Sequence, residues 1–120
     1  EMAQFLFQSS LIITPCRASR DDIVGQGWIE VFLKQSNQNI KKARILTVLN
    51  GVNKRSSILS HVIEQLKEDG VQVAETCISQ RVCFAETNVN KISVIGYNKH
   101  ATKEIVDLTN EALNLIKSEV

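Results

Sequence analysis

Two short apolar runs constrain the fold of this chain more than any other feature. They occupy residues 11–16, Leu-Ile-Ile-Thr-Pro-Cys, and residues 44–49, Arg-Ile-Leu-Thr-Val-Leu. Continuous runs of this length are typical of strands buried on both faces, as in a parallel sheet. Pro15 is expected to end the first strand, because proline cannot donate a hydrogen bond to a neighbouring strand.

A helical pattern follows each run. Ser19 or Asp22 is a candidate N-cap for the first helix, and Ser56 or Ser57 for the second, because a short side-chain oxygen accepts a hydrogen bond from a free backbone N–H. Gly70 stands where the second helix should stop. The apolar stripes are Val24, Trp28, Val31 and Phe32 in the first helix, and Leu59, Val62, Ile63 and Leu66 in the second.

The rest of the chain continues this alternation. Residues 71–74 begin a third predicted strand, and residues 92–95 are either a fourth extended piece or an ordered loop. A last helix is predicted over about 101–117, with an apolar stripe of Ile105, Leu108, Ala112, Leu115 and Ile116. Strands that alternate with helices predict an α/β fold with a parallel sheet. We expect one α/β domain or fragment over residues 1–120, with about three to four strands.

Composition limits the compartment and the partners. The net charge is only +1, so binding to nucleic acid would need a local basic patch. The three cysteines, Cys16, Cys77 and Cys83, fit no zinc spacing and are expected to be reduced and mostly buried. No apolar run is long enough to span a membrane, and residues 1–4 lack the basic region of a signal peptide. A cytoplasmic location is therefore expected.

The sequence lacks the motifs of a self-sufficient enzyme. None of its five glycines is followed by lysine, so there is no phosphate-binding loop. The dinucleotide pattern Gly-x-Gly-x-x-Gly and the serine elbow Gly-x-Ser-x-Gly are also missing. His61 and His100 have no partner at metal-ligand spacing. The residues alone predict no catalytic centre.

The stretch 46–57, Leu-Thr-Val-Leu-Asn-Gly-Val-Asn-Lys-Arg-Ser-Ser, allows two interpretations. Asn50-Gly51 is common in plain turns, yet an amide at a strand end also has the donors and acceptor that reading a base requires. Lys54 and Arg55 are either a solvated pair or contacts to an anion. A cation at a helix N-terminus is mildly unfavourable with the helix dipole, so another interaction could keep it there.

Residues from about 11 to 117 resemble the C-terminal half of a ParA-type partition ATPase, a P-loop protein with a deviant Walker motif. Residues 11–22 resemble the family's strand followed by Pro-x-x-Pro-Ser-x-x-Asp, with Ala18 in place of the second proline. Residues 43–50 resemble the strand that ends in an adenine-side asparagine. Residues 77–87, Cys-Ile-Ser-Gln-Arg-Val-Cys-Phe-Ala-Glu-Thr, carry the family's Gln-Arg-Val segment, and residues 93–97 resemble its Ser-Val ending.

This resemblance implies a partial three-layer P-loop NTPase fold. It implies that Asn50 contacts adenine, with Ile78 and Ser79 forming the other wall of the base pocket. In the family, ATP or ADP is bound with magnesium, and the N-terminal half carries the phosphate loop and the magnesium-holding aspartate. Neither element is present, so the chain is expected to be a fragment or truncated product. No ATP hydrolysis is expected from it alone.

The resemblance also implies contacts to the DNA backbone. Arg55 and Arg81 match positions where family members hold DNA phosphates, and such contacts are salt-sensitive and without sequence readout. An arginine of some relatives is replaced by Cys83. Lysines expected to complete the surface are Lys54, Lys91, Lys99 and Lys103. The implied partners are non-specific DNA of the bacterial nucleoid, a ParB-like centromere-binding protein and a second copy of the chain.

Two alternatives remain open from the sequence. A stand-alone, non-catalytic interaction or dimerisation module could keep the same fold without nucleotide chemistry. An unrelated flavodoxin-like domain would require the order of the motifs to be coincidence. The helix over 22–34 and segment 1–10 would lie near the family's dimer face, where Trp28 is either a core residue or an interface anchor.

Overall fold

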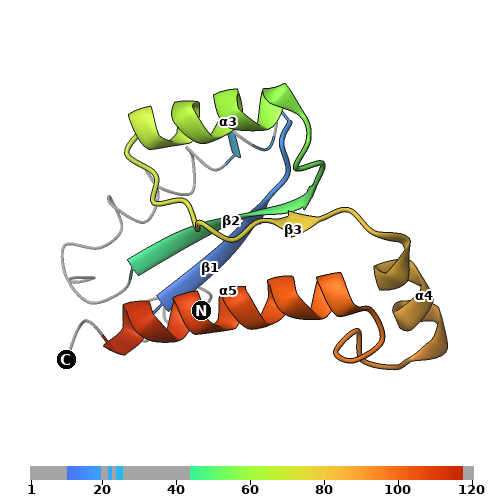
Figure 1. The fold of residues 1–120 in the computed structure, drawn as a ribbon. Helices are drawn as coiled ribbons and strands as arrows, with labels where there is room; N and C mark the ends of the chain where they lie inside the picture. Colours follow the sequence, from blue (N-terminus) through green and yellow to red (C-terminus); the bar gives the residue numbers. More distant parts are fainter. Residues whose placement is uncertain (1–10, 20–21, 23, 26–43, 118–120) are drawn as a thin grey trace.

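The computed structural model describes residues 11–19, 22, 24–25 and 44–117 (Figure 1). In chain order its elements are β1 (Leu11–Cys16), β2 (Arg44–Val52), α3 (Ser57–Glu68), β3 (Ile78–Ser79), α4 (Val82–Asn90) and α5 (Lys99–Lys117). The segment 1–10 and most of the predicted helix over 22–34, Trp28 included, lie outside the described residues.

The strands form a three-stranded parallel sheet in the order β1-β2-β3. The predicted α/β architecture with parallel strands is therefore confirmed. Thr14 pairs with Thr47 in the register of β1 and β2, and their Oγ1 atoms lie 3.2 Å apart. The prediction that Pro15 ends β1 is wrong, because the strand continues to Cys16. Proline is tolerated there since β1 is an edge strand of the described sheet.

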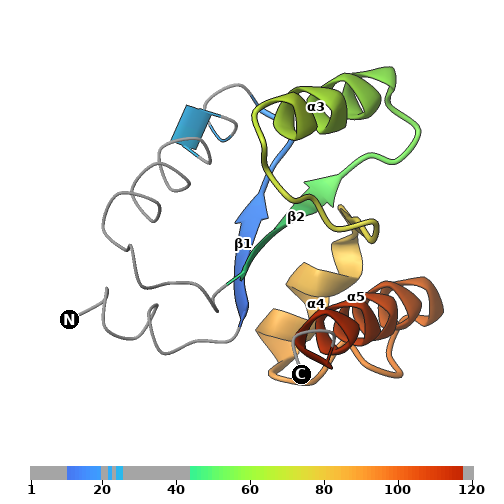
Figure 2. The same ribbon diagram turned by 90° about the vertical axis from the view of Figure 1, so that its left-hand side faces the viewer.

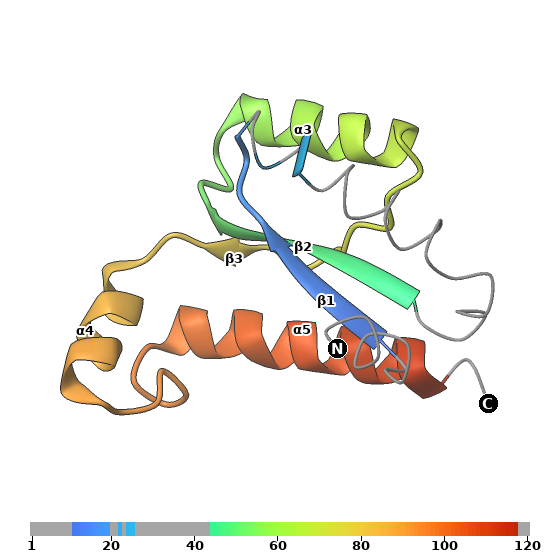
Figure 3. The ribbon, with the colours of Figure 1, turned by 180° about the vertical axis from the view of Figure 1, so that it is seen from behind.

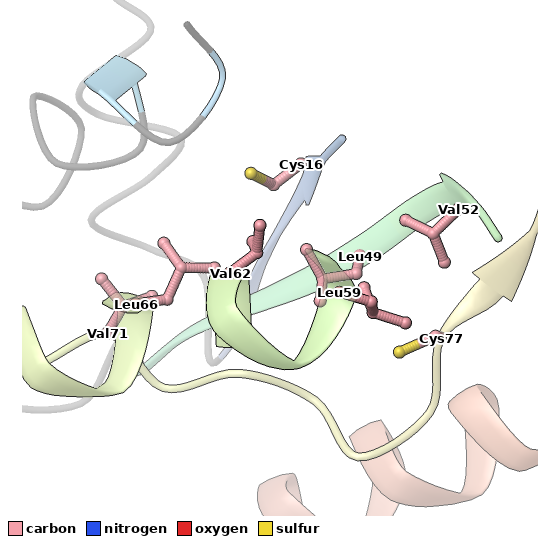
Figure 4. Close-up of a cluster of buried hydrophobic side chains, with 8 residues drawn as sticks. All are labelled: Cys16, Leu49, Val52, Leu59, Val62, Leu66, Val71 and Cys77. Atoms are coloured by element: carbon pink, nitrogen blue, oxygen red, sulfur yellow. The ribbon is translucent and has the colours of Figure 1, made fainter. Parts of the chain in front are cut away.

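Helices cover both faces of the sheet, which gives three layers (Figures 1 and 2). The cluster between the sheet and α3, drawn in Figure 4, consists of Cys16, Leu49, Val52, Leu59, Val62, Leu66, Val71 and Cys77. The cluster on the α5 side consists of Leu46, Val48, Ala74 and Ile78, with Leu11, Phe84, Ile105, Leu108 and Leu115 packed against it. Burial of these apolar side chains on both faces drives the fold.

Strand β2 is longer than predicted and contains a bulge. Its register with β3 pairs Asn50 with Ile78 and Val52 with Ser79, so one extra residue of β2 is accommodated between them. Gly51 takes a φ of +68° there, a conformation that glycine adopts without steric cost. Asn50-Gly51 is therefore neither a plain turn nor the end of the strand.

The third strand is shorter than predicted, and one helix was not predicted. Thr47 hydrogen bonds with Gln72 and Ala74 on the neighbouring segment, but only an isolated bridge to Val73 forms, and β3 begins at Ile78. Residues 92–95 form a loop. Helix α4 follows β3 and lies beyond the start of α5 (Figures 1 and 3).

The helix ends follow the predicted capping signals. Ser56 caps α3 by accepting a hydrogen bond from the Ile58 N–H at 3.3 Å, and Gly70, with a φ of +80°, lies just beyond the end of the helix. Ser19 Oγ accepts a hydrogen bond from the Asp22 N–H at 3.3 Å. Local side-chain chemistry therefore fixes these boundaries as expected.

Helix α5 begins two residues earlier than predicted. Asn98 Oδ1 accepts a hydrogen bond from the Ala101 N–H at 2.9 Å, which satisfies a free backbone donor of the first turn. The predicted stripe packs against the sheet through Ile105, Leu108 and Leu115, but Ile116 is exposed and does not belong to it.

The three cysteines are buried free thiols, as predicted. Burial raises the pKa of the Cys16 and Cys77 thiols, which disfavours the reactive thiolate. Among the helices of the described residues, none has the length and apolar character needed to cross a membrane.

Candidate functional site

Two strand-to-helix loops form a pocket of about 470 Å³, called here the basic pocket. One loop connects β2 to α3 and the other connects β3 to α4, so the pocket lies at the carboxyl ends of two parallel strands. Open α/β sheets bind ligands at this edge. The lining residues are Val52, Asn53, Lys54, Arg55, Ser79, Gln80 and Arg81.

Three of these lining residues are cations, and the sequence had predicted all three as DNA contacts. Lys54 and Arg55 come from the first loop, and Arg81 comes from the second. The Arg55 side chain is exposed, and its backbone N–H donates to Asn53 Oδ1 at 3.0 Å, which orders the turn before α3. The fold therefore brings residues that are distant in sequence to one anion-attracting surface.

A buried carboxylate, Glu104 of α5, lies next to the basic pocket. Ser79 donates to it twice, from its backbone N–H at 3.2 Å and from its Oγ at 2.7 Å. Lys54 Nζ lies 2.6 Å from Glu104 Oε2, and Arg81 Nε donates to Oε1 at 3.3 Å. Glu104 is only 5% exposed, so burial of its charge is stabilised by these four contacts.

These contacts also control the protonation of Glu104. Burial by itself would raise the pKa of its carboxyl group, because desolvation disfavours the charged form. Hydrogen bonds from Lys54, Arg81 and Ser79 outweigh burial and lower the pKa to about 2. The carboxylate is therefore charged at every physiological pH, and it offsets part of the positive charge of the pocket.

Arg81 keeps donors available for a ligand. A guanidinium has five N–H donors, and the contact to Glu104 uses only the Nε atom. The side chain is 27% exposed and lines the pocket. Arg81 is also the N-cap residue of α4, yet its side chain makes no capping hydrogen bond. The outer guanidinium nitrogens and the first N–H groups of α4 remain as donors near the pocket.

The three residues predicted to contact adenine differ in their exposure to solvent and in their partners. Asn50 pairs with Ile78 in the register of β2 and β3, so the two residues lie close together, as predicted. Asn50 is exposed, but Ile78 is 5% exposed and packs in the α5-side cluster. Ser79 lines the basic pocket, and its hydroxyl is already engaged by Glu104. The Asn50 side chain is thus accessible to solvent, whereas the hydroxyl of Ser79 already has a partner.

The other predicted lysines are not among the residues that line the basic pocket. Lys91 ends α4 with a left-handed φ of +56°. Lys103 is exposed on α5, with its Nζ 2.7 Å from Asp107 Oδ2. Lys91 and Lys103 are therefore not part of the lining that Lys54, Arg55 and Arg81 share.

A second pocket, of about 590 Å³, lies at the carboxyl ends of β1 and β2 and shares Val52 and Asn53 with the basic pocket. Its wall includes Arg17 and Asp22, whose Nε and Oδ2 atoms lie 3.4 Å apart. The described ranges contain no group of three or more histidine, cysteine, aspartate or glutamate residues that could hold a metal ion.

The sequence reasoning missed two acidic residues of α5. Glu104 is described above, and Glu111 accepts hydrogen bonds from the backbone N–H groups of Glu75 at 2.9 Å and Thr76 at 3.1 Å. They are seven residues apart, on the same side of the helix as the apolar residue Leu108. Carboxylates that continue an apolar stripe were the signal that could have identified them.

Comparison with known proteins assigns no relatives: no protein-family model matches the chain, and no curated protein matches it. Function is therefore inferred from the chemistry of the basic pocket and from the order of the sequence motifs. The fold class itself is a three-layer α/β arrangement with a parallel sheet.

Proposed function

We propose that this chain is the DNA-contacting, C-terminal half of a ParA-type partition ATPase and that its basic pocket holds phosphates of the DNA backbone. One observation carries the proposal. Three cations from two separate loops, Lys54, Arg55 and Arg81, line one pocket at the carboxyl ends of β2 and β3.

The chemistry of the pocket supports a phosphate ligand. It lies before the N-termini of α3 and α4, where backbone N–H groups and helix dipoles favour anions. Arginine is well suited to phosphate because its planar fork can make two parallel hydrogen bonds. Contacts from these cations to phosphates carry no sequence information, so sequence-independent binding to DNA is expected.

The nucleotide part of the proposal rests on Asn50. In a ParA-type protein, ATP or ADP would bind with magnesium at a phosphate loop that residues 1–120 do not contain. Asn50 would contact the adenine edge from the exposed bulge of β2. The Ser79 hydroxyl, bonded to Glu104, is not assigned to the base in this proposal. A ParB-like protein and a second copy of the chain are the proposed partners.

The test is binding to duplex DNA of unrelated sequences, followed by fluorescence anisotropy at several salt concentrations. Arg55→Ala and Arg81→Ala should each weaken binding, because each removes a phosphate contact. Lys67→Ala is the matched control: it also removes one positive charge, but it lies in the last turn of α3, at the opposite end of the helix from the basic pocket. Equal weakening by all three variants would show that only net charge matters and would refute the assignment of the pocket.

A second candidate function has its own supporting observation. Val82 and Val89, seven residues apart on α4, are 75% and 79% exposed, which leaves an apolar strip on this helix. A stand-alone interaction module would use such a strip for self-association. Sedimentation equilibrium of the wild type and of Val82→Lys tests it: self-association that the substitution abolishes, together with no affinity for DNA, would favour the module.

A further inference from the structure

Glu104 contacts the three cations of the basic pocket to different extents. Lys54 places its only charged atom, Nζ, 2.6 Å from the Glu104 carboxylate. Arg81 contacts the carboxylate through Nε at 3.3 Å. Within the described part of the chain, the Arg55 side chain has no ionic partner. Glu104 therefore divides the cations into one paired, one partly paired and one unpaired side chain.

Lysine and arginine differ in how far a paired carboxylate reduces their ability to bind another anion. The ammonium group of Lys54 is a compact point charge, so a close carboxylate offsets most of its attraction for another anion. The guanidinium of Arg81 spreads its charge over three nitrogens, and its recorded contact with Glu104 uses only Nε. Arg81 is thus oriented by the same carboxylate that engages Lys54.

We propose that Glu104 determines how many cations the basic pocket offers to a polyanion: it withholds Lys54 and orients Arg81, so that phosphates are held mainly by Arg55 and Arg81. This inference rests on the proposed function of the pocket in holding phosphates. Glu104 is a positioning residue in this scheme, since it acts through Lys54 and Arg81 and does not contact the ligand.

Removing the charge of Glu104 should release Lys54. In Glu104→Gln, the amide oxygen can still accept from Ser79, but no negative charge remains to retain the ammonium group. Lys54 then becomes a third phosphate contact. The slope of log K against log salt concentration should steepen by about one unit, because each additional phosphate contact adds about 0.7–0.9 to its magnitude. Affinity at low salt should rise accordingly.

Glu111→Gln is the matched control. It changes the net charge of the chain by the same amount, and Glu111 lies on the same side of α5 seven residues further on. Its carboxylate accepts hydrogen bonds from the backbone N–H groups of Glu75 and Thr76. No ion pair links Glu111 to a lysine or arginine of the described residues. A general effect of charge or of helix docking would therefore appear in both variants.

A second pair of variants keeps the test decisive if Glu104→Gln does not fold. Lys54→Gln and Arg55→Gln remove equal charges from neighbouring positions of one loop. Arg55→Gln should lower the magnitude of the salt slope by about one unit, and Lys54→Gln should lower it by clearly less. A decrease as large for Lys54→Gln as for Arg55→Gln would overturn the inference.

The experiment measures binding of the 120-residue chain to duplex DNA and to inorganic tripolyphosphate, together with the acetylation rate of Lys54 by peptide mass spectrometry. The expected result is a steeper slope and severalfold faster acetylation for Glu104→Gln, with neither change in Glu111→Gln. Identical behaviour of these two variants would refute the inference. Binding of tripolyphosphate with this pattern, but no binding of DNA, would refute only the proposed function. If neither polyanion binds any variant, both fail.

Discussion

The Glu104 carboxylate of α5 lies 2.6 Å from the Nζ atom of Lys54, which precedes α3 on the opposite face of the sheet. Together with its hydrogen bonds from Ser79, this contact joins α5, the end of β3 and the loop after β2. One buried carboxylate thus supports the wall of the basic pocket and limits its positive charge.

Acid should destabilise the protein through this carboxylate. The folded-state pKa of Glu104 is about 2, below its ordinary value of 4.5, so the charged form stabilises the fold. This stabilisation is complete above about pH 4.5 and is lost as the pH falls toward 2. Glu104→Gln should lower the free energy of unfolding at pH 7 by about 2 kcal/mol, a value moderated by the exposure of Lys54.

Urea unfolding at pH 7, 4 and 2.5 checks this expectation. The difference between the wild type and Glu104→Gln should shrink as the pH falls from 7 to 2.5, and it should approach zero only below pH 2, where the wild-type carboxyl group becomes protonated. Other carboxyl groups titrate equally in both proteins, so the difference isolates Glu104. A difference that is independent of pH would contradict the assigned hydrogen-bonding of its charged form.

Gly51 should resist substitution for a reason of backbone conformation. Its φ is +68°, and a Cβ atom placed there meets no other atom within 4 Å. Gly51→Ala should therefore destabilise the fold by about 1 kcal/mol through the left-handed conformation alone. Gly51→Asn should cost less, because asparagine tolerates that region. Thermal unfolding of both variants measures the two losses of stability. Equal losses for Gly51→Ala and Gly51→Asn would argue for steric crowding at the bulge.

The core between the sheet and α3 should be sensitive to truncation at Leu66. This side chain is 1% exposed and packs in the cluster of Figure 4. Leu66→Ala should lower the free energy of unfolding by about 3 kcal/mol, from lost burial and the cavity left behind. Ile58 of the same helix is 61% exposed, so Ile58→Ala should change stability by less than about 0.5 kcal/mol. Chemical denaturation of the two variants distinguishes burial from helix propensity.

The elements predicted correctly are those whose signals are local. The positions of β1 and β2, the Ser56 cap and the stripe of α3 depend on residues within one or two turns of each other. The expected burial of β1 on both faces was wrong, since Ile13 is 48% exposed. The bulge at Gly51 was not predicted, because it is defined by pairing with β3, and an Asn-Gly pair more often indicates a turn. Helix α4 escaped prediction because exposed valines interrupt any amphipathic stripe.

The residues of the candidate site were also predicted only in part from the sequence. Lys54, Arg55 and Arg81 were selected from the sequence motifs, and the fold brings them to one pocket. Lys91 and Lys103 were expected to complete the DNA-contacting surface, and they are not among the residues that line that pocket. Glu104 was not selected, although its place beside the apolar stripe of α5 was a local signal, because its partners Lys54 and Ser79 meet it only after the sheet and α5 have packed. The DNA-binding roles of these residues stay predictions.

The measurement that tests the central claim most directly is the salt dependence of DNA binding by the wild type and by the double variant Arg55→Ala, Arg81→Ala. We expect affinity of the wild type to fall steeply with salt and the double variant to lose about two phosphate contacts, which lowers the magnitude of its slope by roughly 1.4–1.8. An equal slope and affinity for both proteins would contradict the claim that the basic pocket holds the DNA backbone.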